Sequence, residues 1–124
     1  MPWQLKKLSH KGAQAEKSAL HYLKKQGLRL VARNFACPLG ELDLVMLDAD
    51  VLTFIEVRFR SAHQMVDAKS SITPQKVNKI KKSAACFLQH HKKHAYRECR
   101  YDVVAISTDD GSRQNRLEWI QGAF

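Results

Sequence analysis

The stretch GELDLVMLDADVLTFIEVR, residues 40–58, decides the fold because it predicts a β-hairpin whose strands carry acids among apolar residues. Asp43 and Glu56 stand inside these two predicted strands. Acidic residues are depleted in strands, and they are rarely buried unless they are paired or bind a metal. The two acids therefore need an explanation, and a metal-assisted phosphodiesterase site is the sharpest one.

A two-residue turn at positions 49–50 sets the predicted register of this hairpin. In that register Asp43 lies opposite Glu56, and Glu41 lies opposite Arg58. Opposed Cβ atoms are about 5 Å apart, so the carboxylates of Asp43 and Glu56 need a shared proton, a cation or a metal between them. Mg²⁺ and Mn²⁺ prefer such oxygen ligands. The apolar residues predicted on the same face are Val45, Leu47, Leu52 and Phe54.

The hairpin also has a second interpretation. Glu41 and Arg58 can form an ion pair at the sheet edge, with Asp43 at a hydrated edge position. A three-residue turn with a bulge would shift the register and separate Asp43 from Glu56.

The rest of the chain predicts an α/β fold with a mixed central sheet flanked by helices. The strand over residues 51–60 is apolar on both faces near its start, which requires a covering layer on each side. The 124 residues contain no visible linker or repeat, so a single domain over residues 1–124 is predicted. Predicted helices cover 12–26 and 74–90, the second capped by Thr73 and Pro74, and the other predicted strands cover 28–35, 40–47, 100–107 and 117–121, with a loop at 61–72.

The composition points to a polyanionic partner. The formal net charge is +9, which favours nucleic acid, most simply DNA. No segment is apolar and long enough to span a membrane, and residues 1–11 lack the apolar centre of a signal peptide, so a cytoplasmic location is expected. The three cysteines have no metal-type spacing and are predicted to be reduced thiols.

Glu16 is a further anomaly on the first predicted helix. It shares a stripe with Gly12, Ala19, Leu20 and Leu23, which faces the sheet. A carboxylate on an inward face is costly without a partner, so Glu16 is expected to converge on the hairpin acids and help to hold a metal or a water. The alternative is that Glu16 lies at the edge of the stripe and pairs with a lysine.

Three other features have a functional and a structural interpretation. Lys76 and Lys79 on the second helix suit contacts with phosphates, or they belong to a solvated helix face. The histidines at 90, 91 and 94 are better explained as cations at a helix C-terminus than as metal ligands. Asp102, in an apolar strand, is predicted to be a structural partner for an arginine rather than a peripheral site acid.

Taken together, these motifs resemble the YraN family of small bacterial proteins. The resemblance covers about residues 11–119. The motifs that carry it are Gly12-x-x-x-Glu16, Gly27, Arg33-Asn34, residues 40–44, residues 54–60, Lys76 and residues 100–103. It implies a restriction-endonuclease-like fold, similar to Holliday-junction resolvases and other nucleases with an Asp followed by Glu-x-Lys.

The resemblance also implies roles for individual residues. Asp43 and Glu56 would bind Mg²⁺ or Mn²⁺, the carbonyl of Val57 would be a third ligand, and Glu16 would match the helix acid of resolvase-type sites. The implied activity is hydrolysis of phosphodiester bonds in structured or damaged DNA. Resolvase-like enzymes act as two-fold dimers, so a homodimer and protein partners in DNA repair or recombination are compatible with the resemblance.

Arg58 departs from the pattern, because related nucleases have lysine at this position. Arginine keeps its proton at physiological pH and cannot act as a base, although it can grip the scissile phosphate and stabilise charge in the transition state. Arg60, Lys76 and Lys79 are expected to track the DNA backbone. The departure leaves a second function open, a non-catalytic nucleic-acid-binding module that keeps the nuclease fold.

Overall fold

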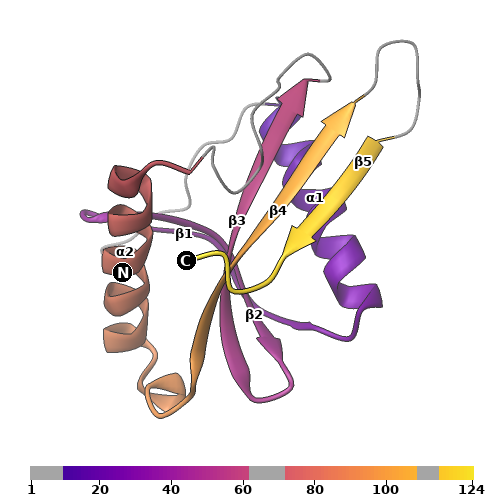
Figure 1. Cartoon of the computed structure of the whole chain (residues 1–124). Coiled ribbons are helices and arrows are strands. Elements are labelled where there is room, and N and C mark those ends of the chain that lie inside the picture. The colour runs from indigo at the N-terminus through magenta and orange to yellow at the C-terminus, as the bar shows by residue number, and fades with distance from the viewer. Residues whose placement is uncertain (1–9, 62–71, 109–114) are drawn as a thin grey trace.

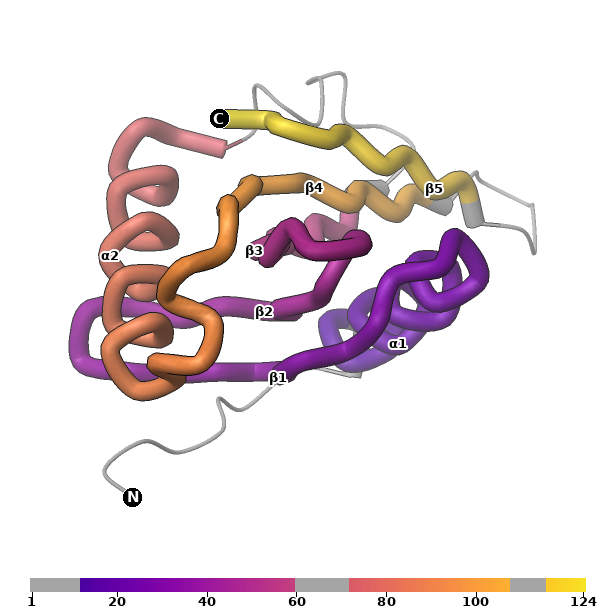
Figure 2. The backbone as a smooth tube through the Cα atoms, turned by 90° about the horizontal axis from the view of Figure 1, so that it is seen from below, coloured from indigo at the N-terminus to yellow at the C-terminus, as the bar shows by residue number. Residues whose placement is uncertain are grey.

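A five-stranded mixed sheet lies between two helices in the computed structural model, which describes residues 10–61, 72–108 and 115–124 (Figures 1 and 2). The strand order is β1-β2-β3-β4-β5; β3 and β4 are parallel, and the other neighbours are antiparallel. The predicted α/β class with a mixed sheet flanked by helices is therefore confirmed. The elements in chain order are α1 (His10–Lys25), β1 (Arg29–Cys37), β2 (Gly40–Asp48), β3 (Val51–Ser61), α2 (Pro74–His90), a short 3₁₀ helix (Lys92–His94), β4 (Cys99–Thr108) and β5 (Asn115–Ile120).

The two helices bury opposite faces of the sheet. On β3, Ile55 and Val57 pack into the cluster that α1 covers, whereas Leu52 and Phe54 pack into the cluster that α2 covers. This alternation confirms that both faces of β3 are apolar and covered. Because α1 packs mainly on β3 and α2 mainly on β2, the neighbouring strands β2 and β3 lie at the centre of the molecule.

The predicted register of the hairpin is confirmed near its turn. Five pairs join β2 and β3, from Asp48 with Val51 to Leu44 with Ile55. Ala49 takes the left-handed conformation, with φ of 52°, as a two-residue turn requires. The ladder ends at Leu44–Ile55, so the predicted pairs Asp43–Glu56 and Glu41–Arg58 are not part of it.

Beyond that point β2 separates from β3. Figure 1 shows β1 and β2 bending towards α2, while β3 continues beside β4. Leu42 joins the cluster under α2 together with Val45, whereas Leu44 packs under α1. The strict alternation that the prediction assumed therefore breaks next to Asp43, because the strand twists away from its partner. We call this divergence of β2 and β3, between Asp43 and Glu56, the fork.

The position of α2 beside the fork follows from its first residues and from one glycine. Thr73 caps the helix, as predicted, with its hydroxyl accepting from the Lys76 N–H at 3.1 Å, and Pro74 takes the first turn. Gly40 has φ of +152°, and a Cβ there would lie 2.6 Å from Ser83 Oγ. A side chain at position 40 would push α2 away from the start of β2, so glycine permits the close approach.

Several smaller predictions also have outcomes. Gly27 has φ of +98° just after α1, as predicted for a helix end, whereas the 3₁₀ helix at Lys92–His94 was not predicted. All three cysteines are free thiols. Most of the predicted loop at 61–72 lies outside the described residues. Among those that are described, no helix is long and apolar enough to cross a membrane.

Candidate active site

Asp43 lies at the fork and replaces a missing backbone contact there. Its Oδ2 accepts a hydrogen bond of 2.8 Å from the Val57 N–H, 14 residues along the chain. The side chain thus provides the bond to β3 at the point where the β2–β3 backbone ladder has ended. Asp43 is buried there, with 5% of the residue exposed. Asp43 can do this because its short side-chain oxygen reaches a strand N–H that a neighbouring carbonyl no longer meets.

Glu56 is the second acid of the fork, one residue before Val57. It is also buried, with 6% exposed, although its neighbours along β3 are apolar. Lys76 on the first turns of α2 faces it, with Nζ 3.6 Å from Glu56 Oε1 and 38% of the lysine side chain exposed. A half-exposed partner makes the pair worth about 1 kcal/mol or less, so the lysine neutralises Glu56 without contributing much to folding.

Glu16 is buried on the inner face of α1, as predicted, but its partner is an amide. The Asn34 side chain, oriented so that its nitrogen faces acceptors, donates to both Glu16 oxygens at 2.7 and 3.0 Å. Asn34 has φ of 55°, a conformation that asparagine tolerates better than most residues. Its neighbours in β1 pair with Leu42 and Leu44, so Asn34 lies across from Asp43.

Asn34 is a site residue that the sequence analysis quoted without giving it a role. The signal in the sequence was an asparagine inside a predicted strand, where this residue is depleted. The structure shows that its amide is buried, so the amide needs a hydrogen-bond partner. Through Asn34, Glu16 is linked to the β1 position beside Asp43. In residues 10–61, 72–108 and 115–124, no group of three or more His, Cys, Asp or Glu side chains is placed to hold a metal. We call Asp43 and Glu56, which stand on the two strands of the fork, the fork pair; Glu16 is linked to this region through Asn34.

The fork pair fits a hard divalent cation. Mg²⁺ commonly takes only one or two carboxylates from a protein and completes its shell with water and substrate phosphates. The Val57 carbonyl could be the third ligand of such a cation. A strand residue directs its N–H and its C=O towards the same neighbouring strand, and the Val57 N–H points at Asp43. The Val57 carbonyl therefore faces the same side as Asp43. The donor set is all oxygen, as Mg²⁺ and Mn²⁺ prefer.

The predicted phosphate contacts are distributed over β3 and α2. Arg58 follows Glu56 by two residues and is half-buried, whereas Lys79 is exposed on α2. Lys76 already contacts Glu56. The side chain of Arg60 lies outside the described residues.

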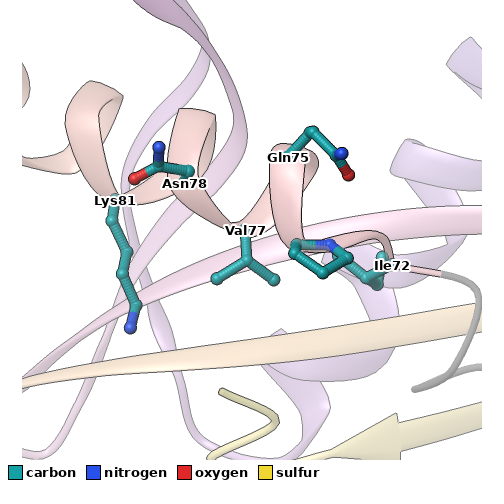
Figure 3. Close-up of a pocket in the computed structure, with 6 residues that line it drawn as sticks. Ile72, Gln75, Val77, Asn78 and Lys81 are labelled. Atoms are coloured by element: carbon teal, nitrogen blue, oxygen red, sulfur yellow. The ribbon is translucent and has the colours of Figure 1, made fainter.

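A pocket of about 630 Å³ lies along the N-terminal half of α2 (Figure 3). Its lining residues are Ile72, Pro74, Gln75, Val77, Asn78 and Lys81, and Figure 3 shows Val77 and Lys81 pointing to one side of the helix and the amide of Gln75 to another. None of these described lining residues is an acid, whereas metal-assisted hydrolysis of a phosphodiester needs oxygen ligands for the cation at the reacting phosphate. We therefore place the candidate site at the fork rather than in the pocket.

Asp102 has the structural role that was predicted for it. Arg100 donates to both of its oxygens at 2.9 Å, and Trp119 Nε1 and the Gly122 N–H add bonds of 2.9 and 3.0 Å. The bonds that Arg100 donates to Asp102, together with the one it donates to Asp48, raise the pKa of the arginine above its usual value.

His90, at the end of α2, and His91 lie at the helix C-terminus as predicted, whereas His94 does not fit the predicted role of a cation there. His90 and His91 bond the carbonyls of Cys86 and Phe87, each at 2.9 Å, and so satisfy groups at the helix C-terminus. His94 is buried and accepts from Arg97 Nε at 3.0 Å. Burial, followed by the nearby cationic groups, lowers the pKa of His94 and so favours its neutral form.

Fold and site together define an α/β protein with a mixed five-stranded sheet and a pair of buried acids where two central strands diverge. The chain belongs to the uncharacterised protein family UPF0102, whose model matches residues 15–106. This is the YraN-like family that the motifs indicated.

Close relatives cover almost the whole chain. A UPF0102 protein of Pseudomonas aeruginosa (strain LESB58) is 46% identical over 114 residues, which are 92% of this chain and 91% of the relative. One from Pseudomonas fluorescens (strain Pf0-1) is 48% identical over 113 residues, 91% of each chain. One from Nitrosococcus oceani is 44% identical over 114 residues, 92% of this chain and 90% of the relative. These relatives carry the family name alone and give no activity.

Proposed function

We propose that this protein is a divalent-metal-dependent endonuclease with a restriction-endonuclease-like fold, which hydrolyses phosphodiester bonds in structured or damaged DNA. The observation that carries the proposal is the fork, where the Asp43 carboxylate bonds the Val57 N–H and Glu56, the residue before Val57, is also buried. Buried acids inside strands are costly, and two of them beside one backbone segment bring together the oxygen ligands that a divalent cation takes. The net charge of +9 supports a polyanionic substrate.

The roles of the residues follow from their positions. Asp43, Glu56 and the Val57 carbonyl would hold Mg²⁺ or Mn²⁺. When bound, such an ion supplies a water of lowered pKa and neutralises charge at the phosphate. Arg58, two residues after Glu56, would grip a non-bridging oxygen of the scissile phosphate with its planar guanidinium.

The remaining residues of the proposal act around this centre. Glu16 holds Asn34 and so positions β1 beside Asp43. Arg60, Lys76 and Lys79 would contact phosphates on either side of the scissile bond. Hydrolysis consumes one water, whose oxygen bonds to phosphorus as the bond to the leaving sugar oxygen breaks.

The test is cleavage of labelled linear, flapped and four-way-junction DNA with Mn²⁺, Mg²⁺ or EDTA, comparing the wild type with Asp43→Asn. We expect metal-dependent products from the wild type and a loss of more than about 10²-fold in the variant, because a charged ligand is removed from the reacting centre. DNA affinity in EDTA should be mostly retained, since the amide oxygen introduced at position 43 can still accept from the Val57 N–H. Equal cleavage by both proteins would assign the activity to a contaminant.

A second candidate function is a non-catalytic nucleic-acid-binding module, and Arg58 favours it. Related nucleases have lysine at this position, so an arginine there fits a fold that binds phosphates without cutting them. Such a module would bind DNA with strong salt dependence and without a metal requirement. Salt-sensitive binding in EDTA, with no products in either metal, would favour this function over the endonuclease.

A further inference from the structure

We propose that Lys76, rather than a residue of β3, is the active-site lysine of this protein. Its ammonium neutralises Glu56 in the metal-free protein and turns to the scissile phosphate when a divalent cation takes over the Glu56 carboxylate. The inference rests on the proposed metal site at the fork, and it assigns Lys76 a place at the reacting phosphate, beyond a contact with the DNA backbone. The observation behind it is the 3.6 Å approach of Lys76 Nζ to Glu56 Oε1.

Two features of the fold determine the position of Lys76: where α2 begins and how closely it approaches the sheet. The Thr73 cap and Pro74 determine where α2 begins, and the cap accepts from the backbone N–H of Lys76 itself. Gly40 lets the helix approach β2, because its missing Cβ leaves room for Ser83. Lys76 therefore lies in the first turns of a helix whose start and whose distance from the sheet are both determined.

The chemistry of the two cationic residues differs. Arg58 offers a planar fork of donors, which suits a phosphate oxygen pair but spreads its charge. Lys76 is a compact point charge on a flexible stem, with three donors, and its side chain is 38% exposed. A flexible ammonium beside a buried carboxylate can exchange one anionic partner for another, so Lys76 can leave Glu56 for a phosphate without rearrangement of the fold.

This placement predicts two effects of opposite sign when the charge of Lys76 is removed. In the absence of DNA, the ammonium and a divalent cation compete for the Glu56 carboxylate, so Lys76→Met should bind the cation more tightly. At the reacting phosphate the same variant lacks a cation, so its cleavage should be slower. A merely structural role for Lys76 would weaken both properties or neither.

The first arm measures Mn²⁺ binding to the full chain without DNA, from the electron paramagnetic resonance signal of free Mn²⁺. We expect Lys76→Met to bind Mn²⁺ about fivefold more tightly than the wild type, the range of a half-exposed ion pair. Lys76→Arg, which keeps the charge, should stay close to the wild type. Lys24→Met, on the exposed surface at the end of α1, is the matched control for charge removal and should leave Mn²⁺ affinity unchanged.

The second arm measures single-turnover cleavage at saturating DNA and Mn²⁺. We expect Lys76→Met to be slower by about 10²-fold, as for loss of one charged contact in the transition state. Tighter Mn²⁺ binding combined with slower cleavage supports the inference, whereas unchanged Mn²⁺ affinity or an unchanged rate overturns it. If the wild type cleaves no DNA, the endonuclease proposal fails, and the Mn²⁺ arm alone decides whether Lys76 stands at the cation site.

Discussion

Two aspartates in the sheet, Asp43 in β2 and Asp102 in β4, are both buried, yet their surroundings differ. Asp102 is fully buried and receives four hydrogen bonds, two of them from one guanidinium. Asp43 stands where two strands diverge, bonds the Val57 N–H and lies near Glu56, a second acid. The comparison teaches that burial alone does not identify a functional acid, because a buried acid surrounded by donors has a complete structural explanation.

The position of the nearest cation sharpens the contrast. Arg100 lies in the same strand as Asp102, reaches it with two parallel bonds and is also held by Asp48. Lys76 comes from a different element, contacts Glu56 at a longer distance and has more of its side chain exposed. The first arrangement is rigid, whereas the second leaves an ammonium that solvent or a ligand can reach.

The largest effect that would test this comparison is on stability. We expect Asp102→Asn to lower the free energy of unfolding by about 3–5 kcal/mol, because it removes the fully buried charge that faces Arg100 and leaves the guanidinium with the partly exposed Asp48. Asp43→Asn should change it by about 1 kcal/mol or less, since asparagine can still accept from Val57. Urea denaturation of both variants measures the difference. Equal losses would mean that Asp43 is as structural as Asp102.

A smaller effect concerns the cationic face beside the fork. We expect Lys79→Ala to weaken DNA binding modestly and to reduce the slope of log affinity against log salt by about 1, the loss of one phosphate contact. Asp102→Asn, at permissive temperature, should leave this slope unchanged because Asp102 lies inside the sheet. Fluorescence anisotropy at several salt concentrations in EDTA measures both slopes. A slope that is the same in Lys79→Ala and the wild type would remove Lys79 from the DNA interface.

The smallest expected effect is on the pH dependence of the free energy of unfolding. His94 contributes to this dependence, so its share has to be known before any pH dependence is assigned to Asp43 or Asp102. Burial lowers the pKa of His94 below its ordinary value of 6.5, so the unfolded chain binds this proton more readily than the folded protein. The contribution of His94 to stability is therefore complete above pH 6.5 and is lost as pH falls towards the lowered pKa. We expect His94→Gln to flatten stability in that window, as measured by urea denaturation at a series of pH values. A wild-type slope in the variant would assign the dependence to other groups.

Much of the fold could be predicted from local signals. The turn at Ala49-Asp50 determines the register of the five hairpin pairs next to it, and Thr73-Pro74 determines the start of α2. The apolar pattern of β3 predicts two covering layers, and both helices are found there. These features depend on interactions between residues close in sequence or on burial patterns, which the sequence shows directly.

The fork was not predicted, because the prediction assumed that the register set by the turn continues to the far end of both strands. The assumption of a straight ladder placed Asp43 opposite Glu56, whereas the strands separate after Leu44–Ile55. Where two strands of a twisted sheet diverge depends on how the whole sheet packs against its helices, and nothing local to residues 40–44 reveals the position. The bond between Asp43 and Val57 depends on that divergence.

The sequence by itself determined which acids are anomalous, because Glu16, Asp43, Glu56 and Asp102 are carboxylates at positions whose neighbours are apolar. The strand sequence also predicted the structural role of Asp102 beside an arginine, whereas only the tertiary structure decided the partners of Glu16 and Glu56. It joined Glu16 to Asn34 and Glu56 to Lys76, residues that lie 18 and 20 positions apart in the chain. A buried carboxylate always requires a partner, but the identity of that partner depends on how helices and strands pack, which local sequence does not encode.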